Sequence, residues 1–137
     1  MAEIVRKVDY FKMEILNKSG EAAKILGALK ADGINFLAFS GFPRGRRAQL
    51  DFIPENSTAF KKAAKKAGLK ISARKIGFLV QGDDHVGSVA SIVTRLGEAR
   101  INITAIDALC AGEGRYGAIL WVKPPDVTKA ARVLGAS

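Results

Sequence analysis

The sequence has little of several residue types that would mark a secreted, membrane-bound or metal-binding protein. It contains one cysteine, one histidine, one tryptophan and four prolines in 137 residues. Cys110 alone cannot form an internal disulfide, which is typical of a reducing compartment. No apolar run approaches the roughly 20 residues that cross a bilayer, and the charged stretch MAEIVRKVDYFK lacks a signal-peptide core. These absences predict a cytoplasmic protein that does not associate with membranes.

Residue groupings typical of enzymes are also missing. His85 and Cys110 lie far apart in the sequence and form no nucleophile–base pair. No catalytic triad, paired-carboxylate site, P-loop or dinucleotide fingerprint is present. Asp83, Asp84 and His85 are adjacent, but three neighbouring residues do not easily converge on one metal ion. We therefore predict a protein that is not an enzyme and needs no metal or cofactor.

Positive charge is in excess, with 22 Lys and Arg against 13 Asp and Glu, a formal net charge of +9. Such an excess favours anionic partners in general, from small carboxylates to nucleic acid. RNA-binding modules of ferredoxin-like topology carry an aromatic signature that is not found here, so nucleic acid is the less expected partner. The clustered basic residues are either a solvated face or a docking surface for an acidic partner or RNA phosphate; they are Arg44, Arg46, Arg47, Lys61, Lys62, Lys65 and Lys66.

The clearest feature that is present is an internal repeat. At an offset of 67 residues, Gly87 falls on Gly20 and Asn102 falls on Asn35. Asn17 and Asp84 precede the two segments and are expected to cap the helices that follow. The apolar positions between them have the i, i+3, i+4, i+7 spacing of an amphipathic helix: Ala22, Ile25, Leu26 and Leu29, and in the second copy Val89, Ile92, Val93 and Leu96.

Each repeat continues in the same order. β-Branched and aromatic residues predict strands over 34–40 and 101–107, and the loops GFPRGRR and AGEGRYG then lead back into AQLDFI and GAILWV at an offset of 69. Second helices follow, which we expect Ser57 and Asp126 to cap. Residues 70–75 supply a last strand to the first copy. The order β-α-β-β-α-β predicts an α+β fold of two ferredoxin-like units, each with helices on one face of an antiparallel sheet.

The second copy has no last strand of its own, because the sequence ends directly after its second helix. Residues 6–10, RKVDY, resemble residues 74–78, RKIGF, at an offset of 68. We therefore expect residues 3–8 to complete the second sheet, within one chain or by exchange between two, since the strand at 76–81 would otherwise be an open edge. The predicted units are residues 9–75 and residues 76–137 with 3–8.

These turns, helices and strands resemble the ACT domain, and the whole chain resembles a tandem, stand-alone ACT protein. The resemblance implies a regulatory protein that binds an amino acid or similar small carboxylate at the interface between its two units. It also implies a homodimer that passes the signal to a partner protein, such as a metabolic enzyme. The positions that match the family's ligand site are Asn17, Lys18, Ser19, Gly20 and Asn35, and in the second copy Asp84, His85, Val86, Gly87 and Asn102.

The chain departs from the family pattern at two aligned positions, which involve three residues. Ser19 and Val86 stand where the family commonly has proline, and Arg100 stands where Gly33 ends the first helix, a place that favours a left-handed backbone. A helix N-terminus suits a carboxylate, an asparagine amide suits both ends of an amino acid, and Asp84 would hold an ammonium better than Asn17. Two alternatives stay open: the repeated glycines and asparagines are purely structural, and the chain is a constitutive protein- or RNA-binding module that uses its basic face.

Overall fold

The computed structural model describes residues 3–137, which divide into two compact units. The N-terminal unit is Asp9–Lys75, and the C-terminal unit combines residues 3–8 with Ile76–Ser137. Strand β1 (Ile4–Leu16) contributes its first residues to the C-terminal unit and the remainder to the N-terminal unit.

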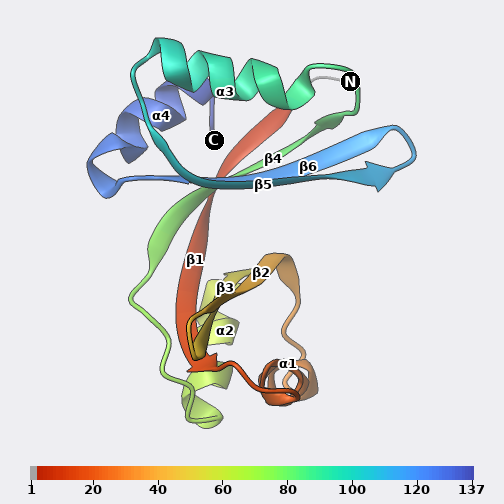
Figure 1. Ribbon diagram of the computed structural model, residues 1–137, viewed down its shortest axis with the longest axis vertical. Helices are drawn as coiled ribbons and strands as arrows, with labels where there is room; N and C mark the ends of the chain where they lie inside the picture. The colour runs from red at the N-terminus through yellow and green to blue at the C-terminus, as the bar shows by residue number, and fades with distance from the viewer. Residues whose placement is uncertain (1–2) are drawn as a thin grey trace. The chain divides into compact units, whose positions relative to one another are not determined.

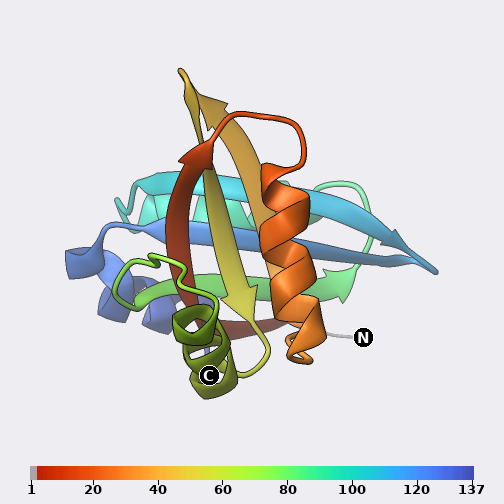
Figure 2. The same ribbon diagram turned by 90° about the horizontal axis from the view of Figure 1, so that it is seen from below.

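The N-terminal unit packs two helices on one face of an antiparallel sheet (Figure 2). Strand β3 (Arg47–Pro54) pairs with both β1 and β2 (Phe36–Arg44). Helices α1 (Glu21–Ala31) and α2 (Ser57–Lys66) bury their apolar sides against it, as the spacing predicts. Phenylalanine dominates this core: the ring of Phe52 lies 5.3–5.6 Å from those of Phe36, Phe39 and Phe60.

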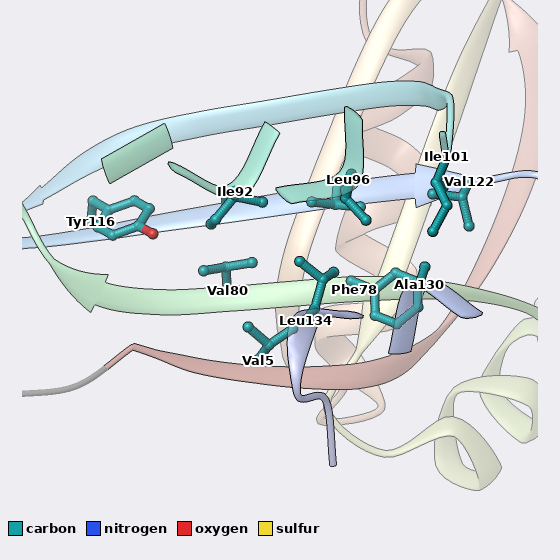
Figure 3. Close-up of a cluster of buried hydrophobic side chains, with 12 residues drawn as sticks. Val5, Phe78, Val80, Ile92, Leu96, Ile101, Tyr116, Val122, Ala130 and Leu134 are labelled. Atoms are coloured by element: carbon teal, nitrogen blue, oxygen red, sulfur yellow. The ribbon is translucent and has the colours of Figure 1, made fainter. Parts of the chain in front are cut away.

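The C-terminal unit repeats this arrangement with mainly aliphatic residues in its core (Figure 3). Strand β6 (Arg115–Val122) pairs antiparallel with β4 (Lys75–Asp83) and with β5 (Ile103–Gly112). Helix α3 (Ser88–Glu98), the 3₁₀ turn Pro124–Asp126 and α4 (Val127–Leu134) cover one face (Figure 1). The core side chains include Phe78, Val80, Ile92, Leu96 and Leu120.

Residues 3–8 lie within the C-terminal unit of the same chain, and β1 neighbours β4 in the strand order. Val5 is buried in the unit's core (Figure 3). The backbone of β1 also meets the chain end, since Ser137 N–H donates to the Val5 carbonyl and Lys7 N–H donates to the Ser137 carbonyl, both at 3.1 Å. The first residues of β1 are therefore held by core packing and by backbone hydrogen bonds.

The expected last strand of the N-terminal unit, residues 70–75, does not form. Residues 69–74 have no regular secondary structure, and β4 begins at Lys75. Ser72 N–H donates to the Lys12 carbonyl at 2.9 Å, but Lys12 N–H donates to the Ser72 hydroxyl rather than to a carbonyl. The serine side chain thus replaces the backbone acceptor that a regular ladder would need at this point.

The two hairpins are longer and tighter than the sequence predicts. Strand β2 runs to Arg44 and β5 to Gly112, so two residues, 45–46 or 113–114, form each turn. Phe52 and Leu120 are equivalent core positions, which makes the offset of the returning strands 68 rather than 69. A bulge between Cys110 and Gly112 accounts for the one extra residue. The expected offset of 69 is wrong, because a one-residue slip would move each side chain to the other face.

The expected helix caps are also wrong at three positions. Helices α1 and α3 are preceded by Gly20 and Gly87 without a side-chain capping bond, so neither Asn17 nor Asp84 is a cap. Helix α2 is capped by Asn56, whose Oδ1 accepts the Ala59 N–H at 2.9 Å. Ser57 instead donates to Asp9 Oδ2 at 2.7 Å, which ties α2 to β1 within the N-terminal unit. Asp126 does precede α4, but its side chain makes no capping bond.

Candidate functional site

In each unit the loop before the first helix is attached to the tip of the hairpin. Asp84 N–H donates to the Gly114 carbonyl at 2.8 Å in the C-terminal unit. The equivalent bond in the N-terminal unit joins Asn17 N–H to the Arg46 carbonyl at 3.1 Å. Two of the predicted site residues are therefore held in place by their backbones, and both side chains remain exposed.

The glycines that open the helices are required by backbone conformation. Gly20 has φ 87° and Gly87 has φ 89°, in the left-handed region that other residues rarely adopt. A Cβ placed on either glycine would meet no atom within 4 Å. The backbone conformation alone therefore accounts for both glycines. No atom of the described residues fills the space beside them, so a ligand could approach there.

The side chain of Ser88 holds the loop before α3 in place through its hydroxyl group. Its hydroxyl, in a side chain that is 6% exposed, accepts the His85 N–H at 3.2 Å. It also lies 2.9 Å from the His85 carbonyl and 3.2 Å from the Asp83 carbonyl. Glu21 occupies the equivalent place in the N-terminal unit, so only the C-terminal loop has this internal hydroxyl.

A hollow of about 410 Å³ lies beside the start of α3. The backbone N–H of Ser88 donates to the His85 carbonyl. The next two N–H groups, of Val89 and Ala90, belong to the first helical turn, which has no intrahelical acceptors. These unpaired donors favour a carboxylate. The hollow combines them with charged and apolar walls: it is lined by Asp84, His85, Gly87, Ser88, Val89, Ala90, Ala108, Leu109, Cys110 and Tyr116.

A hollow of about 360 Å³ occupies the equivalent place in the N-terminal unit. Its wall is more apolar and carries no acidic side chain. Phe39, Phe42 and Pro43 stand on the strand side, and Asn17 and Lys18 stand at the loop. The two hollows therefore differ in charge, with Asp84 and His85 replacing Asn17 and Lys18.

The predicted asparagines lie away from these hollows. Asn35 and Asn102 come just before β2 and β5, whereas the hollows are lined by later residues of those strands. Asn35 Nδ2 donates to Glu55 Oε2 at 3.1 Å, so this side chain already has a partner inside its own unit. Asn102 is exposed, and Lys123 replaces the glutamate. Ser19, Gly20 and Val86 do not line the hollows either, and Val86 is fully exposed.

Sequence reasoning missed a polar cluster under the C-terminal hollow. Tyr116 lines the hollow, and its hydroxyl donates to Glu3 Oε2 at 2.9 Å. The other carboxylate oxygen of Glu3 accepts from Arg95 Nη2 at 2.5 Å. Burial, followed by the bond to Glu3, raises the pKa of Tyr116 to about 12. The three residues are far apart in sequence, and no local pattern links them.

The remaining expectations concern the basic residues, membrane association and metal binding. The lysines of α2 are exposed opposite Phe60, Ala63 and Ala64, and Lys66 pairs with Asp32 at 3.1 Å. Within residues 3–137, no helix has the length and apolar character needed to cross a bilayer. The same residues contain no group of three His, Cys, Asp or Glu side chains that could hold a metal ion.

Comparison with known proteins finds similar structures but no similar sequence. No family model and no curated protein matches the sequence. Protein BT0572 from Bacteroides thetaiotaomicron has a similar structure, with a TM-score of 0.81, 18% identity, and coverage of 97% of this chain and 88% of that one. The ligand-free regulatory subunit of aspartate kinase from Thermus thermophilus matches with a TM-score of 0.64, 18% identity and coverage of 98% and 93%. The corresponding subunit from Thermus flavus gives 0.59, 20%, 98% and 94%.

These likenesses show the fold. The predicted α+β fold of two ferredoxin-like units is confirmed, apart from the irregular segment 69–74 in place of a last strand, and the chain shares this fold with the regulatory subunits of aspartate kinase.

Proposed function

We propose that this protein is a non-catalytic, ACT-type regulatory protein that binds an amino acid or a similar small carboxylate. The hollow beside α3 carries the proposal, because it places unpaired backbone donors, an acidic side chain and apolar walls around one space. The fold supports it, since similar structures include regulatory subunits of aspartate kinase.

The two ends of an amino acid would find different partners in this hollow. The carboxylate would accept from the N–H groups of Val89 and Ala90, and the ammonium would lie near Asp84. A short apolar side chain would contact Ala108, Leu109 and Cys110. The N-terminal hollow lacks the acidic group, so it would prefer a ligand without an ammonium.

Ligand binding would be read by a protein partner, such as a metabolic enzyme, through linkage. A ligand that favours one state of the protein changes partner affinity by typically about 1–3 kcal/mol. The location of the site at an interface between the two units, its use of Asn35 and Asn102, and a homodimeric state all stay predictions from the ACT resemblance.

The test is a thermal-shift screen against the twenty amino acids and common small carboxylates. A ligand at a hundred times its dissociation constant should add about 2.7 kcal/mol of stability. The sharpest variant is Val89→Pro, which removes one N–H donor at a helix position where proline is tolerated. Its matched control is Ala22→Pro at the start of α1.

We expect Val89→Pro to weaken the ligand at least tenfold and Ala22→Pro to leave its affinity unchanged. Asp84→Asn should weaken amino acids more than their deaminated analogues, because it removes only the partner of the ammonium. If both proline variants bind the identified ligand as tightly as the wild type does, the ligand binds elsewhere on the protein. No hit in the whole screen would contradict the proposal.

The exposed lysines of α2 favour the alternative of a constitutive anion-binding module. Four of its ten residues are lysine, and no acidic residue lies in its first turn. Binding to RNA that weakens steeply with salt, and is lost in a Lys61→Gln, Lys62→Gln variant, would support this second function.

A further inference from the structure

One cross-strand pair near the hairpin is inverted in size between the two units. In the N-terminal unit, Ile15 of β1 lies opposite Ala48 of β3. In the C-terminal unit, Gly82 of β4 lies opposite Tyr116 of β6, so the large side chain is on the other strand. A Cβ on Gly82 would lie 2.9 Å from Tyr116 Cε1, closer than real Cβ atoms approach another atom. Glycine therefore leaves the room in which the Tyr116 ring lies over β4.

The Tyr116 ring reaches across β4 to the start of the chain. Its hydroxyl donates to Glu3 Oε2 at 2.9 Å, and Arg95 donates to the other oxygen of the same carboxylate. A phenol from β6 and a guanidinium from α3 thus converge on one carboxylate within the C-terminal unit. The N-terminal unit has Ala48 and Ala28 at the equivalent positions, so it cannot form this site.

Both donors of this carboxylate site also belong to the surroundings of the C-terminal hollow. Tyr116 lines the hollow together with Ser88 at the start of α3, and its ring is 5% exposed in the core cluster of Figure 3. Arg95 follows Ser88 by seven residues, which places it on the same side of α3 two turns later. Glu3 does not line the hollow, but it contacts the residues that fix one of its walls.

We propose that Glu3 is a positioning residue of the candidate ligand site: it fills a carboxylate-binding site formed by Tyr116 and Arg95, and thereby holds the Tyr116 ring as a wall of the hollow. This inference rests on the proposed function and extends it to the start of the chain. A buried hydroxyl that loses its acceptor turns toward another partner, so the ring would leave its place without Glu3. A wall that is fixed before the ligand arrives favours binding.

Substitutions in the first strand separate positioning from general loosening of that strand. Glu3→Ala frees Tyr116, whereas the matched control Val5→Ala removes a core contact of the same strand and leaves the Tyr116–Glu3 bond intact. The dissociation constant of the amino acid identified by the thermal-shift screen should rise at least tenfold in Glu3→Ala and less than threefold in Val5→Ala. Glu3→Gln keeps an acceptor for the phenol and should give an intermediate loss. Thermal unfolding verifies that all three variants fold.

The outcomes distinguish this inference from the proposed function. A ligand that Val89→Pro weakens and Glu3→Ala does not would support the proposed function and overturn the positioning role. Equal weakening by Val5→Ala and Glu3→Ala would also overturn it, because loosening of residues 3–8 would then account for both effects.

The second measurement needs no ligand in the hollow. The chain has two tyrosines, Tyr10 and Tyr116, so ring-labelled tyrosine gives two sets of NMR signals. Nuclear Overhauser contacts from the Tyr116 ring to methyl groups of its core cluster should weaken in Glu3→Ala. Concentrated sodium acetate, but not sodium chloride, should restore them by refilling the carboxylate site. A ring that keeps its contacts in Glu3→Ala, or that acetate does not return, would overturn the proposal even if the screen finds no ligand.

Discussion

The two units share left-handed backbone positions but fill them with different residues. At the end of the first helix, Gly33 has φ 74° in the N-terminal unit and Arg100 has φ 61° in the C-terminal unit. At the hairpin turn, Gly45 has φ 64° and Glu113 has φ 53°. Glycine adopts these angles without strain, whereas arginine and glutamate do not. The C-terminal unit therefore keeps the backbone of its counterpart at a local cost in stability.

The C-terminal unit also contains stabilising contacts that the N-terminal unit lacks. Tyr116 stands where the N-terminal unit has Ala48, and its hydroxyl group bonds to Glu3 beside Arg95. This cluster ties the start of the chain to α3 and β6. The C-terminal unit therefore combines strain at two turns with a polar cluster that has no counterpart at the equivalent position of the N-terminal unit.

Deletion of residues 1–8 should produce the largest difference in stability between the two units. It removes Val5 from the core, the backbone bonds to Ser137 and the Glu3 carboxylate, so the C-terminal unit should lose at least about 3 kcal/mol. Hydrogen exchange resolves the two units, and the effect should be concentrated in residues 76–137. An unchanged exchange pattern there would show that residues 3–8 are not needed to complete the sheet.

Tyr116→Phe should remove the polar anchor at a cost of about 1–2 kcal/mol, because a partly buried carboxylate loses a hydrogen bond. The pKa of Tyr116 is raised to about 12 in the folded protein, above its ordinary value of 10.0. Its contribution is complete below pH 10 and is lost as the pH rises through 12, since the unfolded chain then releases the proton more readily.

Denaturant unfolding at several pH values checks this. Wild type should lose more stability than Tyr116→Phe between pH 10 and 12. Tyr10, whose pKa is also raised by burial and by Asp51, is present in both proteins and cancels in the difference. Parallel pH profiles would show that the Tyr116–Glu3 bond does not contribute.

Arg100→Gly should make the two helix ends alike and stabilise the protein by about 1 kcal/mol. The opposite kind of change, Gly33→Ala, replaces a glycine at the equivalent position and should destabilise the protein by a similar amount. Both positions have the same hydrogen bonds, because Gly33 and Arg100 N–H donate to residues three earlier in the chain. Thermal unfolding of the two variants measures the difference, and a destabilised Arg100→Gly protein would indicate an unrecognised role for the arginine side chain.

Sequence patterning predicted the fold because apolar periodicity reports which face of each element is buried. It placed Ile25, Leu29, Ile92 and Leu96 in the cores of the two units. The same reasoning failed for Val89 and Val93, which are partly exposed, because periodicity shows which face of a helix is apolar but not how far the sheet extends beneath that face. It also failed at residues 70–75, where one serine hydroxyl replaces the backbone acceptor of a ladder.

The candidate site was predicted only in part, for a related reason. The loop residues Asp84, His85 and Gly87 were found because they lie next to each other and repeat residues 17, 18 and 20. Ala108, Cys110 and Tyr116 come from the far end of a hairpin whose length and register depend on a bulge. No pattern in the sequence marks that bulge, so the wall of the hollow became visible only in the structure.

Glu113→Asn should give the smallest effect, a stabilisation of about 0.5 kcal/mol. Glu113 and Gly114 both have positive φ, 53° and 72°, as a type I′ turn requires, and asparagine accepts this conformation better than glutamate. Gly45→Glu should destabilise the other hairpin, and amide exchange at the ends of β5 and β6 measures the local gain. Because the Gly114 carbonyl accepts the Asp84 N–H, a more stable turn should also restrict the motion of the loop before α3. An asparagine variant that slows exchange at the strand ends but not at Asp84 would show that the turn and the loop move independently.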